Sequence, residues 1–172
     1  VNIVTGQSIP VTYSSKDESF TDGKQVVISG NIKEKDFDPT VGLALHEGSH
    51  CKLTDFKLLK NLIHNPKVIP DDVWNMIETK YANNAADDED KSWIVRNYIT
   101  GHVKSLLNYV EDRRIDSFVY RSAPGYQGYY QAMYDKYFNS TIVDKGLQSD
   151  EMRNCVWESY MFRILKLTNA NC

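Results

Sequence analysis

The sequence predicts a helix-dominated α+β fold with a small sheet near the N-terminus, in a single domain over residues 1–172. Residues 1–30 are rich in short β-branched and aromatic segments separated by Gly and Ser. Residues 38–172 carry helical periodicity instead. A chain of 172 residues, 41% of them hydrophobic, can bury one core but is short for two ordinary domains.

Three segments in the first thirty residues have the composition of strands. They contain Val, Ile and Tyr, which favour a pleated backbone. Residues 21–24 have the composition of a turn before the third segment. We expect an antiparallel sheet of two or three strands in front of the first strong helix. The predicted strands are residues 1–4, 9–13 and 25–29.

The first strong helix is predicted to begin at Asp38, whose side chain can cap it, with Pro39 in the first turn. Gly42 and Gly48 each weaken this helix by about 1 kcal/mol relative to Ala. Because the helix keeps them, we expect close packing at both glycines. More helix is expected over residues 52–63.

Four further helices are expected in the remainder of the chain. The acidic run 87–90 is interpreted as a solvated loop that ends the first of them. The Pro124-Gly125 pair breaks the second, which is the longest. The first of the four begins at Pro70, and the second spans about 93–120. The third begins at Tyr129, and the fourth spans about 151–167.

Composition excludes several functions. The formal net charge is −3 with both signs interspersed, so no basic surface for nucleic acid is expected. No stretch reaches the roughly eighteen apolar residues of a membrane-spanning helix, and the N-terminus lacks the order of a signal peptide. Three cysteines without a CxxC pair favour a reducing compartment, so we expect a cytoplasmic protein. They are Cys51, Cys155 and Cys172.

The segment His46-Glu47-Gly48-Ser49-His50 has the HExxH pattern. Two histidines four residues apart on a helix lie on one face, so both imidazoles can bind one cation. Glu47 projects beside the same position, where it can deprotonate a zinc-bound water instead of ligating the ion. The hydroxide then attacks a carbonyl, and Glu47 passes the proton to the leaving amine. The pattern predicts zinc-dependent peptide hydrolysis.

A catalytic zinc site needs a third protein ligand. The position six residues after His50 is not a histidine, and no cysteine precedes Cys51, which excludes two alternative ligand sets. Residues 108–116 offer carboxylates. Glu111 is predicted as the ligand, because a buried carboxylate on an apolar helix face needs a cation, and Asp112 is the alternative. The residues expected to share the face of Glu111 are Leu107, Ile115 and Phe118.

Several residues are given supporting roles. Asp116 or Asn108 could accept the second imidazole hydrogen of a ligating histidine and fix its tautomer. Tyr126, beside the Pro-Gly turn, is the predicted phenol donor to the oxyanion of the reaction. Arg113 and Arg114 are expected to pair with the neighbouring carboxylates.

An HExxH motif followed much later by a helical glutamate resembles the gluzincin group of zinc peptidases. Residues 44–50 together with Val110-Glu111-Asp112-Arg113-Arg114-Ile115-Asp116 look like the metallopeptidase-like domains of bacterial and phage proteins, which often precede a von Willebrand A domain. The resemblance implies a zincin-like fold and a Zn²⁺ cofactor. It also implies His46, His50 and Glu111 as ligands and Glu47 as general base. The chain departs from the common ExxxD form, because Ile115 stands four residues after Glu111.

Two functions remain open. The first is a zinc endopeptidase with a protein or peptide substrate, whose residues 25–29 could bind that substrate as an edge strand. The second is a non-catalytic zinc-binding or interaction module of a larger protein, with a covalently linked or associated regulatory domain. A structural zinc prefers four ligands with several cysteines and has no need of Glu47, which favours the enzyme. A phage-encoded chain would be found in a virion or the host cytoplasm.

Overall fold

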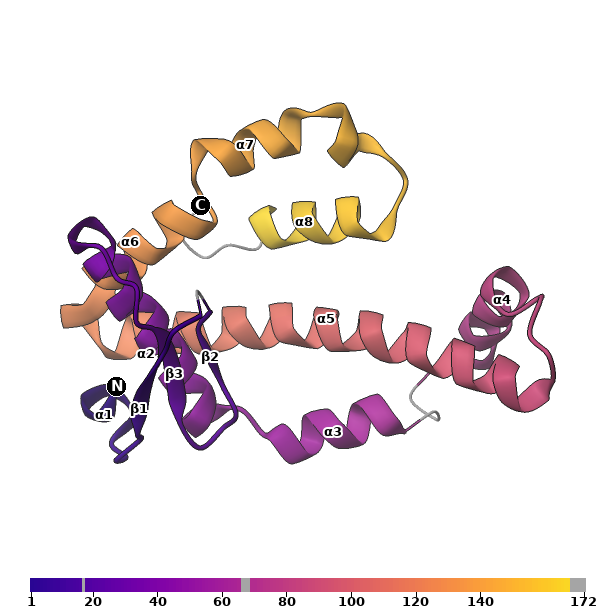
Figure 1. Ribbon diagram of the computed structural model, residues 1–172, viewed down its shortest axis with the longest axis horizontal. Helices are drawn as coiled ribbons and strands as arrows, with labels where there is room; N and C mark the ends of the chain where they lie inside the picture. The colour runs from indigo at the N-terminus through magenta and orange to yellow at the C-terminus, as the bar shows by residue number, and fades with distance from the viewer. Residues whose placement is uncertain (17, 66–68, 168–172) are drawn as a thin grey trace. The chain divides into compact units, whose positions relative to one another are not determined.

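The computed structural model describes residues 1–16, 18–65 and 69–167, and it has the predicted helix-dominated α+β architecture (Figure 1). The chain forms two compact units. The first comprises Val1–Thr54 and Val110–Cys172, and the second comprises Asp55–Tyr109. The long helix α5, Asp88–Ser122, contributes residues to both.

The three-stranded sheet lies in the first unit and has the order β1-β3-β2. β1 (Val11–Ser14) is parallel to β3 (Val26–Ser29), whereas β2 (Phe20–Thr21) is antiparallel to β3. The sheet is therefore mixed, and the prediction of an antiparallel sheet is wrong. The reason is that β2, which was not predicted, intervenes between β1 and β3, so the chain reverses twice before β3 begins.

Two strand predictions need further correction. Residues 1–4 do not form a strand, because α1 (Asn2–Thr5) occupies that segment and ends at Gly6 with a positive φ. The Asn2 side chain accepts a hydrogen bond from the Ile9 backbone N–H, which stabilises this local fold. β3 lies between β1 and β2, so residues 25–29 do not form an edge strand.

The HExxH segment lies on α2, Phe37–Leu53. The helix follows directly on the 3₁₀ turn η1 (Glu34–Asp36), so the chain is already helical before Asp38. Asp38 therefore lies in the first turn instead of capping the helix. In this position its negative charge still interacts favourably with the helix dipole.

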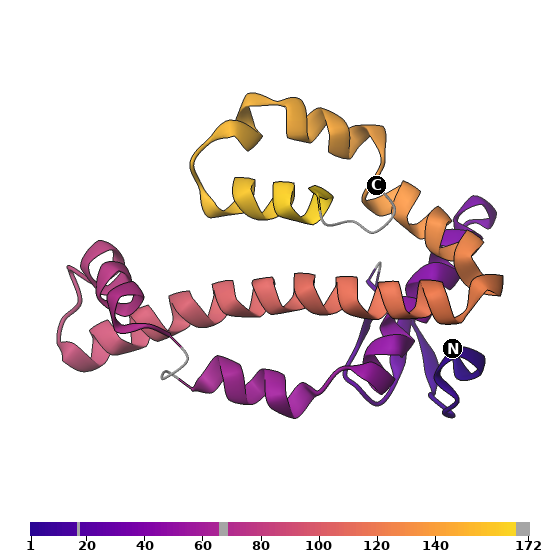
Figure 2. The same ribbon diagram turned by 180° about the vertical axis from the view of Figure 1, so that it is seen from behind.

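α2 is the centre of the first unit because two of its faces are buried. Ala44 and Cys51 pack against Val26 and Ile28 of β3 and against Ile9, which precedes β1. Leu45 belongs to a second cluster, formed with α5 and α6 (Gln127–Tyr137), and Figures 1 and 2 show α2 next to the strands and α6 from opposite sides. The other buried members of this cluster are Val119, Tyr130, Met133 and Tyr134.

The close packing expected at the two glycines is confirmed. A Cβ at Gly42 would collide with the backbone carbonyl of Tyr129 in α6, and a Cβ at Gly48 would collide with the side chain of Val1. Larger residues at these positions would separate α2 from its neighbours.

The C-terminal region of the first unit differs from the prediction of one last helix over 151–167. α6 follows the turn η3 (Pro124–Tyr126) and starts two residues before Tyr129. Only the second part of the predicted last helix is regular, because a 3₁₀ turn and a break precede it. The elements after α6 are α7 (Thr141–Gln148), which was not predicted, η4 (Asp150–Arg153) and α8 (Trp157–Leu167).

The second unit contains α3 (Phe56–His64), α4 (Asp71–Tyr81) and the first part of α5. The helix expected over 52–63 is interrupted, because the Asp55 side chain caps α3 by accepting two backbone N–H hydrogen bonds. The unit has its own core of Ile77, Ala82, Val95 and Ile99.

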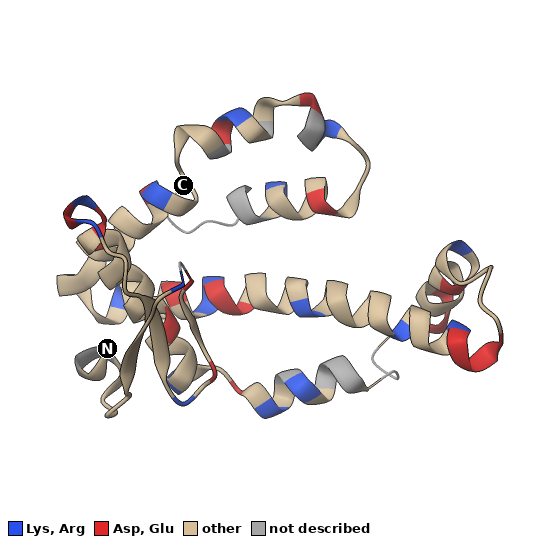
Figure 3. Ribbon diagram, viewed as in Figure 1, with Lys and Arg blue, Asp and Glu red and all other residues tan. Residues whose placement is uncertain are grey.

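The acidic run 87–90 is not a loop. Residues from Asp88 on form the first turn of α5, and the Asp87 side chain accepts a hydrogen bond from the Asp90 backbone N–H. Negative charge at a helix N-terminus favours the helix dipole, and Figure 3 shows this turn in red. Within the residues described, no helix has both the length and the apolar composition needed to cross a membrane.

Candidate metal centre

Three side chains of the first unit converge on one point. His46 and His50 lie one turn apart on α2, and Asp112 lies on α5. One ligand atom of each lies within 4.8 Å of the other two. The Asp112 Oδ1 atom is 3.2 Å from His50 Nε2 and 3.9 Å from His46 Nε2. The imidazole rings are nearly perpendicular, at 88°, with centroids 4.9 Å apart. Two ring nitrogens and one carboxylate oxygen thus face a common position.

The other nitrogen of each imidazole has a hydrogen-bond partner. His46 Nδ1 lies 2.7 Å from Asp116 Oδ1, and a carboxylate can only accept, so Nδ1 carries the hydrogen. His50 Nδ1 lies 3.0 Å from Thr54 Oγ1. The Thr54 hydroxyl donates its one hydrogen to Glu111 at 2.6 Å, so it accepts from His50. Both Nε2 atoms therefore keep a lone pair for a ligand.

Asp116 and Asn108 were the two predicted acceptors of an imidazole hydrogen, and the structure brings Asp116 to His46. The Asp116 side chain is buried, and Oδ2 accepts a hydrogen bond from the Tyr134 hydroxyl and from Arg113 Nη2 at 3.3 Å. Burial alone lowers the pKa of His46, but the hydrogen bond and charge of Asp116 outweigh it, so this pKa is raised. The expected pairing of Arg113 with a carboxylate is also confirmed.

Glu111, the predicted third ligand, is connected to His50 through the Thr54 hydroxyl. Its carboxylate accepts hydrogen bonds from Thr54 Oγ1, from Arg114 Nε at 2.7 Å and from Arg114 Nη2 at 2.6 Å. The Arg114 guanidinium holds the pKa of Glu111 below its usual value, with Thr54 adding to the effect. The expected pairing of Arg114 with a neighbouring carboxylate is therefore confirmed. Arg114 also donates a hydrogen bond to the Leu53 carbonyl at 2.6 Å. The structure thus brings Asp112, the alternative, to the two imidazoles.

The Glu47 carboxylate is half-buried on α2, between the two histidines in sequence. Burial raises its pKa, and the nearby Asp112 and Asp116 add to this, while the two imidazoles oppose it. Among the described residues, none donates a hydrogen bond to this carboxylate. Its oxygens are therefore available to a water molecule or a substrate.

Tyr126, the predicted phenol donor, ends the turn η3 and packs against the cluster that contains Leu45. Its ring centroid is 6.2 Å from that of Tyr129. The structure therefore gives Tyr126 a packing role, and its role as a donor to the oxyanion stays a prediction.

Sequence reasoning missed two residues of the site. Thr54 is the C-cap residue of α2, four residues after His50, so its short spacing from the histidine was a signal present in the sequence. Tyr134 lies 18 residues from Asp116 on another helix, and no local spacing indicates their contact.

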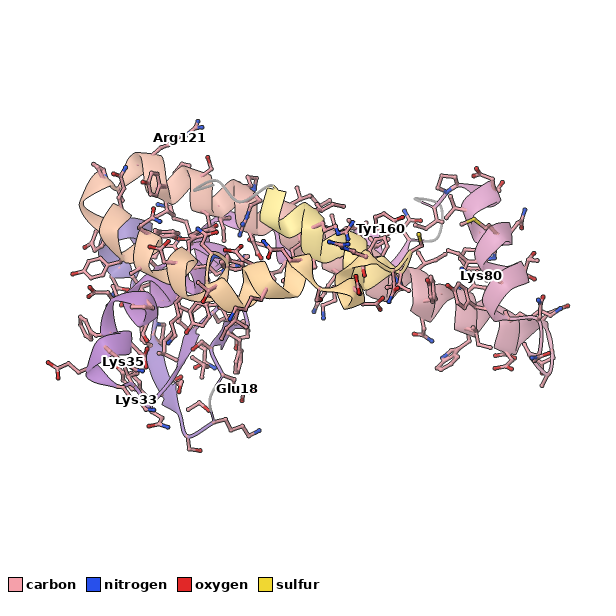
Figure 4. The ribbon with its side chains drawn as sticks, turned by 90° about the horizontal axis from the view of Figure 1, so that it is seen from above. Glu18, Lys33, Lys35, Lys80, Arg121 and Tyr160 are labelled. Carbon is pink, nitrogen blue, oxygen red and sulfur yellow. The ribbon has the colours of Figure 1, made fainter. Side chains whose placement is uncertain are left out.

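A cavity of about 570 Å³ lies next to His46 in the first unit. Thr40, Leu43 and His46, spaced three residues apart, line it along α2. Met133 and Phe138 supply apolar walls from α6 and its end. Ligand-binding cavities commonly have this size and mixture of surfaces. The charged residues that line it are Glu18 and Lys33, which Figure 4 labels, and the Asp36–Lys136 ion pair, with 3.0 Å between Oδ1 and Nζ.

The donor set fits a divalent metal ion. Two neutral imidazoles and one carboxylate form the ligand set of several catalytic zinc sites, and such a set also binds Fe(II) in oxygenases. Comparisons with protein-family models, with curated proteins and with solved structures found no match for this chain. The functional argument therefore rests on the geometry of the site.

Proposed function

We propose that this chain is a zinc-dependent peptidase whose ion is held by His46, His50 and Asp112. The observation that carries the proposal is the orientation of the two imidazoles: each Nδ1 hydrogen is taken by an acceptor, and each Nε2 faces the same position as Asp112. A histidine pair on an ordinary solvated helix has no need of this arrangement. Three protein ligands also leave room for a water molecule and a substrate, as catalytic sites require.

The residues around this position suit hydrolysis. A bound zinc ion supplies Lewis acidity, which polarises a carbonyl group and acidifies water. Glu47 takes the proton from the attacking water and delivers it to the leaving amine. Its half-buried carboxylate suits this exchange, because burial favours the protonated form more than solvent does. Asp116 stabilises the orientation of His46 throughout.

The proposed substrate is a protein or peptide. The cavity beside His46 follows α2 and offers apolar walls near Leu43 and Met133. A side chain of an extended peptide can occupy this cavity while its backbone carbonyl lies near the two histidines. The charged residues that line the cavity then contact the polar backbone of the peptide.

Zinc binding to the purified chain is the first test. We expect one zinc ion per chain in the wild type. His46→Ala and Asp112→Ala should lose more affinity than the roughly 10- to 100-fold that removal of a supporting hydrogen-bond partner costs. Glu111→Ala should stay within about 10-fold, because Glu111 acts through Thr54.

The outcomes of this titration separate the alternatives. If Glu111→Ala abolishes binding and Asp112→Ala does not, Glu111 is the third ligand. If the wild type binds no zinc, or binds Fe(II) in preference to zinc, the proposal is wrong.

Cleavage of a mixture of quenched fluorescent peptides is the second test. Glu47→Gln should keep its zinc and lose about 100-fold or more in cleavage rate, because it cannot transfer the proton. Glu34→Gln, an exposed carboxylate in η1, is the matched control and should cleave like the wild type. Full activity of Glu47→Gln would contradict its role as base. A wild type that binds zinc and cleaves no peptide would favour the non-catalytic zinc module.

A further inference from the structure

One buried carboxylate joins three polar partners in the first unit. Asp116 is 2% exposed. Its Oδ1 accepts from His46 Nδ1 at 2.7 Å, and its Oδ2 accepts from the Tyr134 hydroxyl and from Arg113 Nη2 at 3.3 Å. A carboxylate removed from water needs such donors. The direction of Oδ1 toward His46 therefore depends on what holds Oδ2.

The Tyr134 side chain is held firmly enough to fix Oδ2. It is fully buried in the cluster with Leu45 and Met133. Its ring lies 5.1 Å from the Phe138 ring, and the Arg113 guanidinium lies 5.1 Å from its centroid. An aromatic side chain enclosed in this way keeps one rotamer, so its hydroxyl has a fixed position.

We propose that Tyr134 is a positioning residue of the metal centre: through its hydroxyl it orients Asp116, and Asp116 keeps His46 in the tautomer whose Nε2 faces His50 and Asp112. The proposal rests on the proposed metal-binding role of His46. Without the hydroxyl, Arg113 is the remaining donor to Oδ2. The carboxylate can then turn toward Arg113, and Oδ1 moves away from His46 Nδ1.

The adjacent turn of α6 offers a matched control. Tyr130 is as buried as Tyr134 and belongs to the same cluster. Its hydroxyl makes no hydrogen bond to Asp116. Replacing Tyr130 by Phe removes the same atom from the same core but removes no hydrogen bond from the carboxylate.

The experiment compares Tyr134→Phe with Tyr130→Phe by two measurements. Zinc alone is titrated against a chromophoric chelator, and the His46 ring nitrogens are observed by ¹⁵N NMR in the metal-free protein. Tyr134→Phe should weaken zinc binding about 10-fold and change His46 from one tautomer to a mixture. Tyr130→Phe should leave both measurements at wild-type values. If the two variants behave alike, whether both are unchanged or both are weakened, Tyr134 has only a packing role.

Two additions keep the test decisive. In the Asp116→Asn background, Tyr134→Phe should cause no further loss of zinc affinity, because the two residues act as a unit; a full additional loss overturns the proposal. If Tyr134→Phe does not fold, a ring-fluorinated tyrosine at this position changes the acidity of the phenol and keeps its shape. A shifted His46 Nδ1–H signal supports the proposal, and an unshifted one contradicts it.

The proposal and the proposed function can fail separately. If the wild type binds no zinc, the peptidase proposal is wrong, while the His46 tautomer in the metal-free protein still decides the role of Tyr134.

Discussion

The two histidines of the candidate metal centre are supported by networks of different kinds. On the His46 side, Asp116 is 2% exposed and accepts from the fully buried Tyr134. On the His50 side, Thr54 connects to Glu111, whose partner Arg114 has a side chain that is 49% exposed. Both networks leave Nε2 free for a ligand. The first does so among buried groups and the second within reach of solvent.

The difference also concerns how each network is assembled. Thr54 is the C-cap residue of α2, four residues after His50, so the local geometry of the helix end brings them together. Asp116 lies 70 residues after His46, so their contact exists only when α2 and α5 are packed, and the contact with Tyr134 also requires α6. Buried polar networks are costly to break because an orphaned group cannot turn to water, whereas exposed ion pairs contribute little. His46 should therefore depend on tertiary structure more strongly than His50.

The largest expected effect is on stability. Asp116→Asn should lower the free energy of unfolding of the metal-free protein by about 3 kcal/mol, because Arg113, whose side chain is 13% exposed, loses its charged partner. Glu111→Gln, the matched change on the other side, should cost less than about 1 kcal/mol, because Arg114 is half-exposed and can be solvated. Urea denaturation measures both values. Equal losses would show that burial does not separate the two networks.

The second largest expected effect is a difference in zinc affinity between variants of the two networks. Asp116→Asn should weaken binding toward the upper end of the roughly 10- to 100-fold range for supporting partners, and Thr54→Val toward the lower end. Valine keeps the shape of threonine and removes both of its hydroxyl hydrogen bonds. Chelator competition gives the constants, and Thr12→Val on the exposed strand β1 serves as control. The comparison breaks down if Thr54→Val weakens binding as much as Asp116→Asn.

The contrast also shows which residues of the candidate site could be predicted from the sequence. His46, Glu47 and His50 were predictable because one helical turn fixes their spacing. The choice between Glu111 and Asp112 depends on how α5 is rotated about its axis, since adjacent residues differ by about 100°. The helical-wheel argument placed Phe118 on the buried side, but Phe118 is exposed. The buried residues of this stretch are Ile115, Asp116 and Val119.

Hydrophobic patterning misjudged this rotation because Asp116 interrupts the apolar stripe. A buried aspartate is counted as a surface residue unless its partners are known, and two of its partners come from α2 and α6. The mixed sheet was not predicted because the sequence pattern gave no sign of β2. β2 has only two residues, too few to give a strand pattern, yet its position decides the direction of β3.

The smallest expected effects concern pH and have opposite signs in the two networks. Arg114 lowers the pKa of Glu111 below its ordinary 4.5, so the stabilisation by Glu111 is complete above that value and is lost as pH falls through the lower, folded-state pKa. The pKa of His46 is raised above 6.5 by Asp116 against the effect of burial, so its stabilisation is complete below 6.5 and is lost as pH rises through the raised pKa. In the metal-free protein, Glu111→Gln should therefore flatten the acid limb of the stability profile and leave the limb above pH 6.5 unchanged, whereas Asp116→Asn should remove the loss of stability above pH 6.5. Urea unfolding across this pH range, with a chelator present, measures both limbs. If Glu111→Gln also altered the limb above pH 6.5, the two networks would be coupled through α5, and His46 and His50 would share one support.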